Sequence, residues 1–278
     1  MQKIIITADD YGMCDIVNDA IDAGIQNGFI TTTNVMVNME ALDAAAKLRE
    51  RFPNISIGMH WNVTTGKPVT DPKEIPTLID KNGKFFSITE FKRKYARGKI
   101  QKKDLELELC NQYEMFRNVC GEANYWNTHE NSALSTKTFP VFSEVALRYG
   151  IKATRTFQRV YYDKINLSTK QAVREMLVKY FFELWFTHIR KTYKMPSARV
   201  VSFDRISKTQ GNVLMDALKK DGRNYIEVVF HPATSANHPC FGNISTERVK
   251  EYEYTSSKEI MSLYRKNGFK FCTFEDLI

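Results

Sequence analysis

The sequence predicts an α/β protein folded as an irregular (β/α) barrel of the TIM type, with parallel strands. Short apolar runs, typical of buried parallel strands, alternate with stretches whose apolar residues recur at helical spacing. About eight such strands fit into the chain, which suits a barrel. An open, doubly wound sheet is the alternative, because a strand count does not distinguish the two.

The expected strands are short apolar runs that end in polar residues, beginning with Ile4-Ile5-Ile6. Strands that alternate with helices are joined by right-handed crossovers and therefore lie parallel. In chain order, the expected strands are Lys3–Thr7, Asn34–Val37, Ile55–Met59, Tyr125–Thr128, Ile151–Thr154, Arg199–Phe203, Tyr225–Phe230 and Phe269–Thr273.

The expected helices fall between most of these strands. In Asp15–Asn27 the apolar residues form one stripe, Asp15 is expected to cap the start, and Gly28 is expected to close the end. The remaining expected helices are Glu40–Arg51, Thr138–Tyr149, Gln171–Ile189, Gly211–Lys219 and Thr246–Asn267.

We expect one domain over residues 1–278, interrupted by an insertion at about 65–122. Turn signals such as Lys67-Pro68 and Asn82-Gly83 lie within this insertion. On the carboxyl-end face of a barrel, a long insertion usually shapes a substrate cleft.

Composition excludes several classes of protein. No window approaches the ~18 apolar residues of a membrane span, and no signal peptide precedes the first strand, so we expect a cytoplasmic protein without a membrane partner. The five cysteines include no Cys-x-x-Cys pair, so neither a disulfide framework nor a zinc ribbon is indicated. The net charge of +8 is interpreted as a solvated basic face, with no nucleic-acid partner.

Carboxylates and histidines gather where strands end. Asp9 and Asp10 follow the first strand, and His60, His129 and His231 follow three later ones. Because these ends converge on one rim of a parallel barrel, we expect the five side chains to form one site.

Such a set has the equipment to hydrolyse an amide or ester. One carboxylate and two imidazoles can hold a divalent cation, which lowers the pKa of a bound water and polarises a carbonyl. A second carboxylate can take a proton, and a further histidine can give one to the leaving amine. The chain has no Gly-x-Ser-x-Gly elbow and no dinucleotide fingerprint.

Three motifs resemble those of the YdjC/ChbG-like carbohydrate deacetylases. Ala8-Asp9-Asp10-Tyr11-Gly12 is similar to the opening Ala-Asp-Asp-Phe/Tyr-Gly motif of that family. The stretch from Gly58 to Thr64 resembles Gly-Leu-His-Leu-Asn-Leu-Thr, and Phe230-His231-Pro232 resembles a late His-Pro strand end. The motifs occur in the expected order over nearly the whole chain.

The resemblance implies a role for each of these residues. Asp10, His60 and His129 would bind one divalent cation, Mg²⁺ or Zn²⁺. Asp9 would be the general base, and His231 would be the general acid or would stabilise the tetrahedral intermediate. Similar proteins carry an arginine where Arg155 stands, and it would either orient Asp9 or form a surface ion pair. Members of the family are often dimers, so a homodimer is expected.

The segment around His129 departs from the family's pattern His-x-Asp-x-His-x-His, of which only His129 remains. Asn127, Glu130 and Asn131 are candidates for hydrogen bonds to sugar hydroxyls, and Asn62 is a further candidate substrate contact. Trp61 and Trp126 would either stack on a sugar or belong to the core.

The expected function is metal-dependent removal of the acetyl group from an N-acetylated sugar or oligosaccharide, with Asp9 as base and His231 as acid. One alternative is a metal-dependent isomerase or hydrolase acting on another small molecule. A second is a carbohydrate-binding relative without catalytic activity.

Overall fold

The computed structural model describes residues 2–151, 153–155, 201–203, 225–239, 241 and 245–277, with scattered positions in 173–192 and 214–219. The expected helices Gln171–Ile189 and Gly211–Lys219 are described only at scattered positions, which are helical. Arg199 and Val200 of an expected strand lie outside the described residues.

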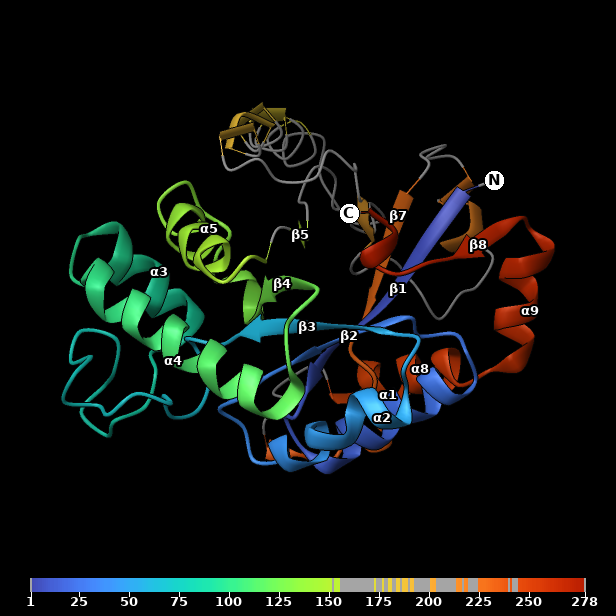
Figure 1. Ribbon diagram of the computed structural model, residues 1–278, viewed down its shortest axis with the longest axis horizontal. Coiled ribbons are helices and arrows are strands. Elements are labelled where there is room, and N and C mark those ends of the chain that lie inside the picture. Colours follow the sequence, from blue (N-terminus) through green and yellow to red (C-terminus); the bar gives the residue numbers. More distant parts are fainter. Residues whose placement is uncertain are drawn as a thin grey trace.

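The eight described strands form one parallel sheet in the order β5-β4-β3-β2-β1-β7-β6, with β8 paired to the first residues of β1 (Figure 1). Each expected strand is present, which confirms the predicted parallel architecture. The strands are β1 Gln2–Tyr11, β2 Thr32–Val35, β3 Ser56–Trp61, β4 Tyr125–Thr128, β5 Ala153–Thr154, β6 Val201–Phe203, β7 Tyr225–Phe230 and β8 Phe269–Phe271.

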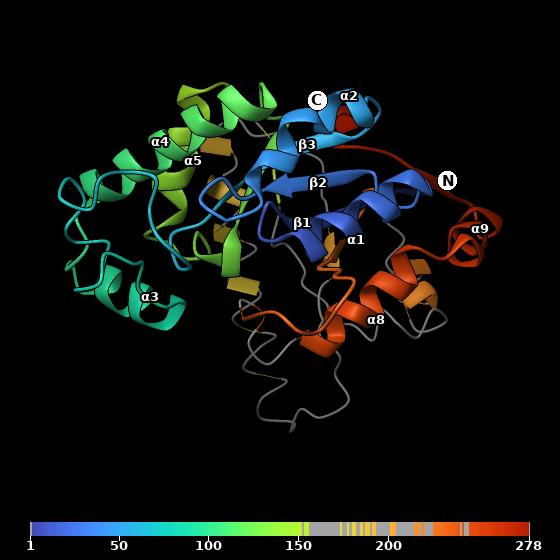
Figure 2. The same ribbon diagram turned by 90° about the horizontal axis from the view of Figure 1, so that it is seen from below.

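Helices cover the outer face of this sheet. In Figures 1 and 2, α1 lies with α8 on one side, and α4 lies with α5 beside β3 and β4. The described helices are α1 Asp15–Gln26, α2 Leu48–Arg51, α3 Ile88–Ala96, α4 Lys102–Cys120, α5 Phe139–Arg148, α8 Ser245–Thr255 and α9 Lys258–Lys266.

Three helix predictions need correction. Cys14, not Asp15, is the N-cap residue of α1, and Asp15 begins the helix. The expected helix Glu40–Arg51 is a 3₁₀ helix, Leu42–Lys47, followed by the single turn α2. The expected helix Thr246–Asn267 is two helices, because the Ser257 hydroxyl accepts a hydrogen bond from Ile260 N and so caps a new helix, α9.

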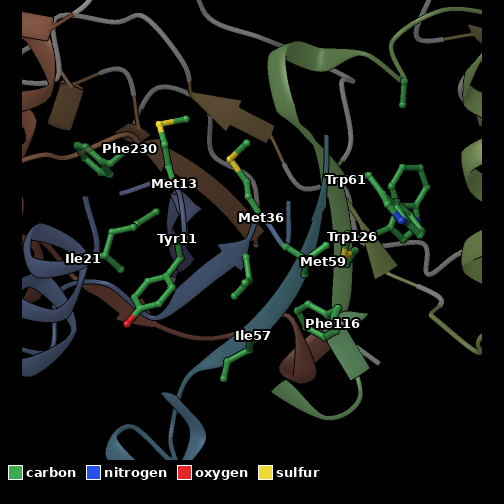
Figure 3. Close-up of a cluster of buried hydrophobic side chains, with 14 of the residues drawn as sticks. Tyr11, Met13, Ile21, Met36, Ile57, Met59, Trp61, Phe116, Trp126 and Phe230 are labelled. Atoms are coloured by element: carbon green, nitrogen blue, oxygen red, sulfur yellow. The ribbon is translucent and has the colours of Figure 1, made fainter. Parts of the chain in front are cut away.

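The strands divide their side chains between two apolar clusters. Ile4, Ile6 and Ala8 belong to the large core under the helices, which Figure 3 shows around Tyr11, Met36 and Met59. Ile5 points the other way, into a small cluster with Tyr125, Ala153, Cys272 and Phe274. Successive residues of a strand face opposite sides, so the odd-numbered residues of β1 before its register shift, up to Asp9, face the barrel interior.

The insertion lies between β3 and β4 and contains α3 and α4. Glu108 of α4 is fully buried, and its carboxylate accepts hydrogen bonds from the backbone N–H groups of Val69 and Thr70. This contact holds the insertion to its own helix. Gln112 on the same helix ties it to the barrel, because its side chain accepts from Asn62 N and donates to Asn62 O directly after β3. The assignment of residues 1–278 to one domain stays a prediction.

Candidate metal centre and active site

The predicted site residues lie at the carboxyl ends of neighbouring strands. Ala8 on β1 pairs with Phe230 on β7, so the next residues along the chain, Asp9 and His231, lie beside each other at this end of the sheet. Farther along the sheet, beyond β2, His60 on β3 pairs with Asn127 on β4. These registers explain how residues far apart in the sequence reach one rim.

A β-bulge brings the two adjacent carboxylates to the same site. Ala8 pairs with Thr33 and Tyr11 with Val35, so Asp9 and Asp10 together lie opposite Asn34. Asp10 has a φ of 73°, in the left-handed region that aspartate tolerates better than most residues. In a regular strand the two side chains would point to opposite faces, and the bulge removes that restriction.

Asp10, His60 and His129 converge as candidate metal ligands. One ligand atom from each residue lies within 4.8 Å of the others. Asp10 Oδ1 is 3.2 Å from His60 Nε2 and 3.0 Å from His129 Nδ1. Asp10 and His60 are buried, whereas the His129 side chain is 13% exposed. One oxygen and two nitrogens form a donor set that suits a divalent cation with open positions.

Asn127 orients His60 for this role. Its Nδ2 donates to Asp9 Oδ1 at 3.0 Å, which leaves its Oδ1 to accept from His60 Nδ1 at 2.5 Å. With the proton on Nδ1, Nε2 of His60 carries a lone pair that faces Asp10 and makes no well-formed hydrogen bond with the described residues.

Asp9 is the most heavily hydrogen-bonded carboxylate of the site. Arg155 donates to both of its oxygens, at 2.7 and 3.0 Å, and the side-chain amides of Asn34 and Asn127 donate to Oδ1. Burial by itself raises the pKa of Asp9, but the Arg155 guanidinium, helped by His60 and His231, holds that pKa well below its ordinary value.

Arg155 is itself held by Glu227 on β7. The Glu227 carboxylate is fully buried and accepts from Arg155 Nε and Nη2 at 3.0 and 2.9 Å. Arg155 is only 6% exposed, so the alternative of a surface ion pair is wrong. The arginine instead contacts both oxygens of Asp9 from inside the barrel.

His231 stands at the open side of the site. Its side chain is 29% exposed, and its Nε2 lies 3.7 Å from Asp9 Oδ2, beyond a hydrogen bond. Its backbone N–H donates to the Glu251 carboxylate of α8. The imidazole is therefore fixed at its base and accessible at its tip.

Two predicted substrate contacts are placed elsewhere. Trp61 is fully buried in the core, where its Nε1 donates to Leu109 O and its ring packs against Trp126 (Figure 3). Asn62 is also fully buried, and its Oδ1 accepts from Thr64 N and Thr65 N within its own turn. Neither side chain presents a surface to a sugar.

The other three predicted substrate contacts lie near the ligands. Asn127 is 3% exposed and is engaged by His60 and Asp9. Glu130 is exposed and Asn131 partly exposed, in the turn that follows His129. Both have positive φ, at 50° and 52°, so this turn carries backbone strain beside a candidate ligand.

Sequence reasoning missed Asn34, Glu227 and Arg248, although a signal for two of them was present. Glu227 precedes His231 by four residues and therefore faces the same side of its strand. Asn34 is the polar residue that begins the expected strand Asn34–Val37, and the structure places it opposite the two aspartates. Arg248 lies on helix α8, and no strand pattern indicates it.

The sequence is similar to a known protein family over nearly its whole length. A sequence profile described as "YdjC-like protein" matches residues 3–266. The chain belongs to the YdjC-like family. A chitooligosaccharide deacetylase of Escherichia fergusonii is 31% identical over 99% of this chain and 98% of its own length. A carbohydrate deacetylase of Clostridium beijerinckii is 24% identical over 99% of this chain and 100% of its own length.

The solved structure of a similar protein supports the fold. A protein of Enterococcus faecalis, named as a candidate cellobiose-phosphate cleavage protein, superposes with a TM-score of 0.74 at 19% identity. The match covers 99% of this chain and 98% of that one.

Among the described residues, no helix combines the length and apolar character needed to cross a membrane. The cytoplasmic location and the homodimer stay predictions.

Proposed function

We propose that this YdjC-like protein is a metal-dependent hydrolase that removes the acetyl group from an N-acetylated sugar or oligosaccharide. The observation that carries the proposal is the cluster of Asp10, His60 and His129 beside a second carboxylate, Asp9. Family membership, and relatives named as carbohydrate and chitooligosaccharide deacetylases, support the same class of reaction.

The residues present fit a divalent cation. His60 Nε2 is buried, lacks a well-formed hydrogen bond with the described residues, and faces the same Asp10 oxygen as His129 Nδ1. A cation bound by these three atoms would lower the pKa of a water molecule and polarise the acetyl carbonyl. Nitrogen and oxygen ligands together suit Zn²⁺, and Mg²⁺ is the other candidate.

Asp9 is proposed as the general base. Its low pKa keeps it ionised over the working pH range, and its Oδ2 faces the open side of the site toward His231. Such a carboxylate is a weak base, so it suits a water that has already been made acidic. Arg155, held by Glu227, keeps the carboxylate in one orientation.

His231 is proposed as the acid that protonates the leaving amine. It is the most exposed of the three strand-end histidines. It follows β7, which lies on the other side of β1 from β3 and β4, the strands that precede or carry His60 and His129. Its partial exposure allows a substrate to approach the ring, which a proton donor requires.

We expect acetate release from N-acetylated mono- or oligosaccharides, with loss of the activity after chelation and recovery after Zn²⁺ or Mg²⁺ is returned. Asp9→Asn should reduce kcat by at least 10²-fold because the base is lost. Acetate assays measure turnover, and elemental analysis measures the metal.

The matched control is His60→Ala, which should lose the metal, whereas Asp9→Asn should keep it. Unchanged turnover in Asp9→Asn would remove the assigned role of Asp9. Metal and glycan binding without acetate release from any acetylated sugar would favour a carbohydrate-binding protein instead.

A further inference from the structure

Arg248 is a buried cation directly behind the candidate metal ligand Asp10. It lies on α8 and is 3% exposed, and its Nη2 donates to Asp10 Oδ2 at 2.5 Å. Its guanidinium carbon lies 4.7 Å from the centre of the Phe241 ring. Its Nε and Nη1 are buried without hydrogen-bond partners among the described residues.

The two oxygens of the Asp10 carboxylate have different partners. Oδ2 is taken by Arg248, whereas Oδ1 faces His60 Nε2 and His129 Nδ1. A carboxylate with one oxygen in a charge-assisted hydrogen bond has the other oxygen free for a cation. Asp10 is therefore arranged to coordinate through Oδ1 alone.

The burial of Arg248 argues that this contact has a purpose. A guanidinium removed from water is costly unless an anion compensates it, and Asp10 is the carboxylate that does so among the described residues. One turn along the same helix, Glu251 holds the backbone N–H of His231. Helix α8 thus supports two strand ends of the site.

We propose that Arg248 is a positioning residue that holds Asp10 as a one-oxygen ligand and thereby sets the affinity of the site for its cation. This inference rests on the metal site of the proposed function. Groups that hold metal ligands from behind contribute roughly 10–100-fold to metal affinity. The positive charge of Arg248 repels the cation and by itself would lower the affinity of the site. If removing Arg248 nevertheless weakens cation binding, positioning of Asp10 outweighs this repulsion.

The test measures Zn²⁺ affinity of the full chain by competition with a chelator, without sugar. Arg248→Met removes the charge at similar length and should weaken binding at least tenfold. Arg248→Lys retains a cation and should recover part of that loss. Lys250→Met, on the exposed side of the same helix, is the control and should bind as the wild type does.

Thermal unfolding of the metal-free proteins shows whether each variant folds. If Arg248→Met does not fold, Arg248→Gln replaces it, with the same expected loss. Zn²⁺ binding within threefold of the wild type, or tighter, in either neutral variant would overturn the proposal. A lysine variant as weak as the methionine variant would also overturn it, because the loss would then come from packing.

The result is separable from that of the proposed function. If the wild type binds Zn²⁺ but releases no acetate, the deacetylase proposal fails and the role of Arg248 is still decided by affinity. If the wild type binds no divalent cation, the metal site and the inference about Arg248 are both overturned.

Discussion

Asn127 joins the candidate metal ligands to the candidate base. An amide has an acceptor at one end and a donor at the other, so Asn127 accepts from His60 and donates to Asp9 with one side chain. A carboxylate here would also accept from His60 but would repel Asp9. The residue identity at this position therefore affects the base more than the ligand.

Asn127→Asp should accordingly separate the two functions. The new carboxylate next to Asp9 should raise the pKa of the base, because like charges disfavour ionisation. We expect kcat at acidic pH to fall about tenfold or more, because the acidic limb of its pH profile shifts upward with the pKa of the base, while Zn²⁺ affinity holds or increases. A pH series of acetate release and a chelator competition measure the two. A parallel loss of affinity would contradict this assignment.

At the scale of elements, strand parity selects the side chains that reach the site. Asp9, His60, Asn127, Arg155 and Glu227 all face the barrel interior, and residues next to them such as Trp61 and Trp126 face the outer core. Parity explains why Trp61 is not a sugar contact. It does not explain Asp10, which reaches the site only through the bulge.

Gly58 shows how tightly the interior is filled on β3. A Cβ there would lie 2.4 Å from Asn34 Oδ1 and 2.4 Å from Tyr125 Cε1. Gly58→Ala should lower the free energy of unfolding by about 1–3 kcal/mol and displace Asn34 from Asp9. Urea unfolding measures the first effect, and acetate release measures the second.

The control is Ser56→Ala, two residues earlier on the same face of β3. Its hydroxyl has no partner among the described residues, so its loss should change the free energy of unfolding by less than about 0.5 kcal/mol. Equal stability of the two variants would mean that the strand shifts to accommodate the extra methyl group.

At the scale of the whole molecule, the site is a buried cluster of charge in an apolar barrel. The carboxylates of Asp9, Asp10 and Glu227 face the guanidinium groups of Arg155 and Arg248. Negative charge is in excess among these groups, and a divalent cation would offset it. Binding should therefore stabilise the folded barrel as well as prepare it for chemistry.

Saturating Zn²⁺ should raise the melting temperature of the metal-free protein. A cation at about 100 times its dissociation constant adds about 2.7 kcal/mol, because it binds only the folded state. Differential scanning calorimetry with and without chelator measures the shift. His129→Ala should abolish it, and an equal shift in that variant would place the binding elsewhere.

The sequence by itself determined the parallel strands and the residues at their ends. Apolar runs that stop at Asp9, His60, His129 and His231 are local features, and strand ends of a parallel barrel meet on one rim. For the same reason the family could be recognised from the motifs that contain these residues.

Only the tertiary structure decided which contacts these side chains make with one another. The bulge at Asp10 depends on the register of β1 with β2. The hydrogen bonds between Arg155 and Glu227 join residues from two different strand regions. Arg248, which contacts Asp10, lies on a helix more than 200 residues farther along the chain. Each depends on the placement of one element against another. A pattern along a single strand or helix carries no record of that placement.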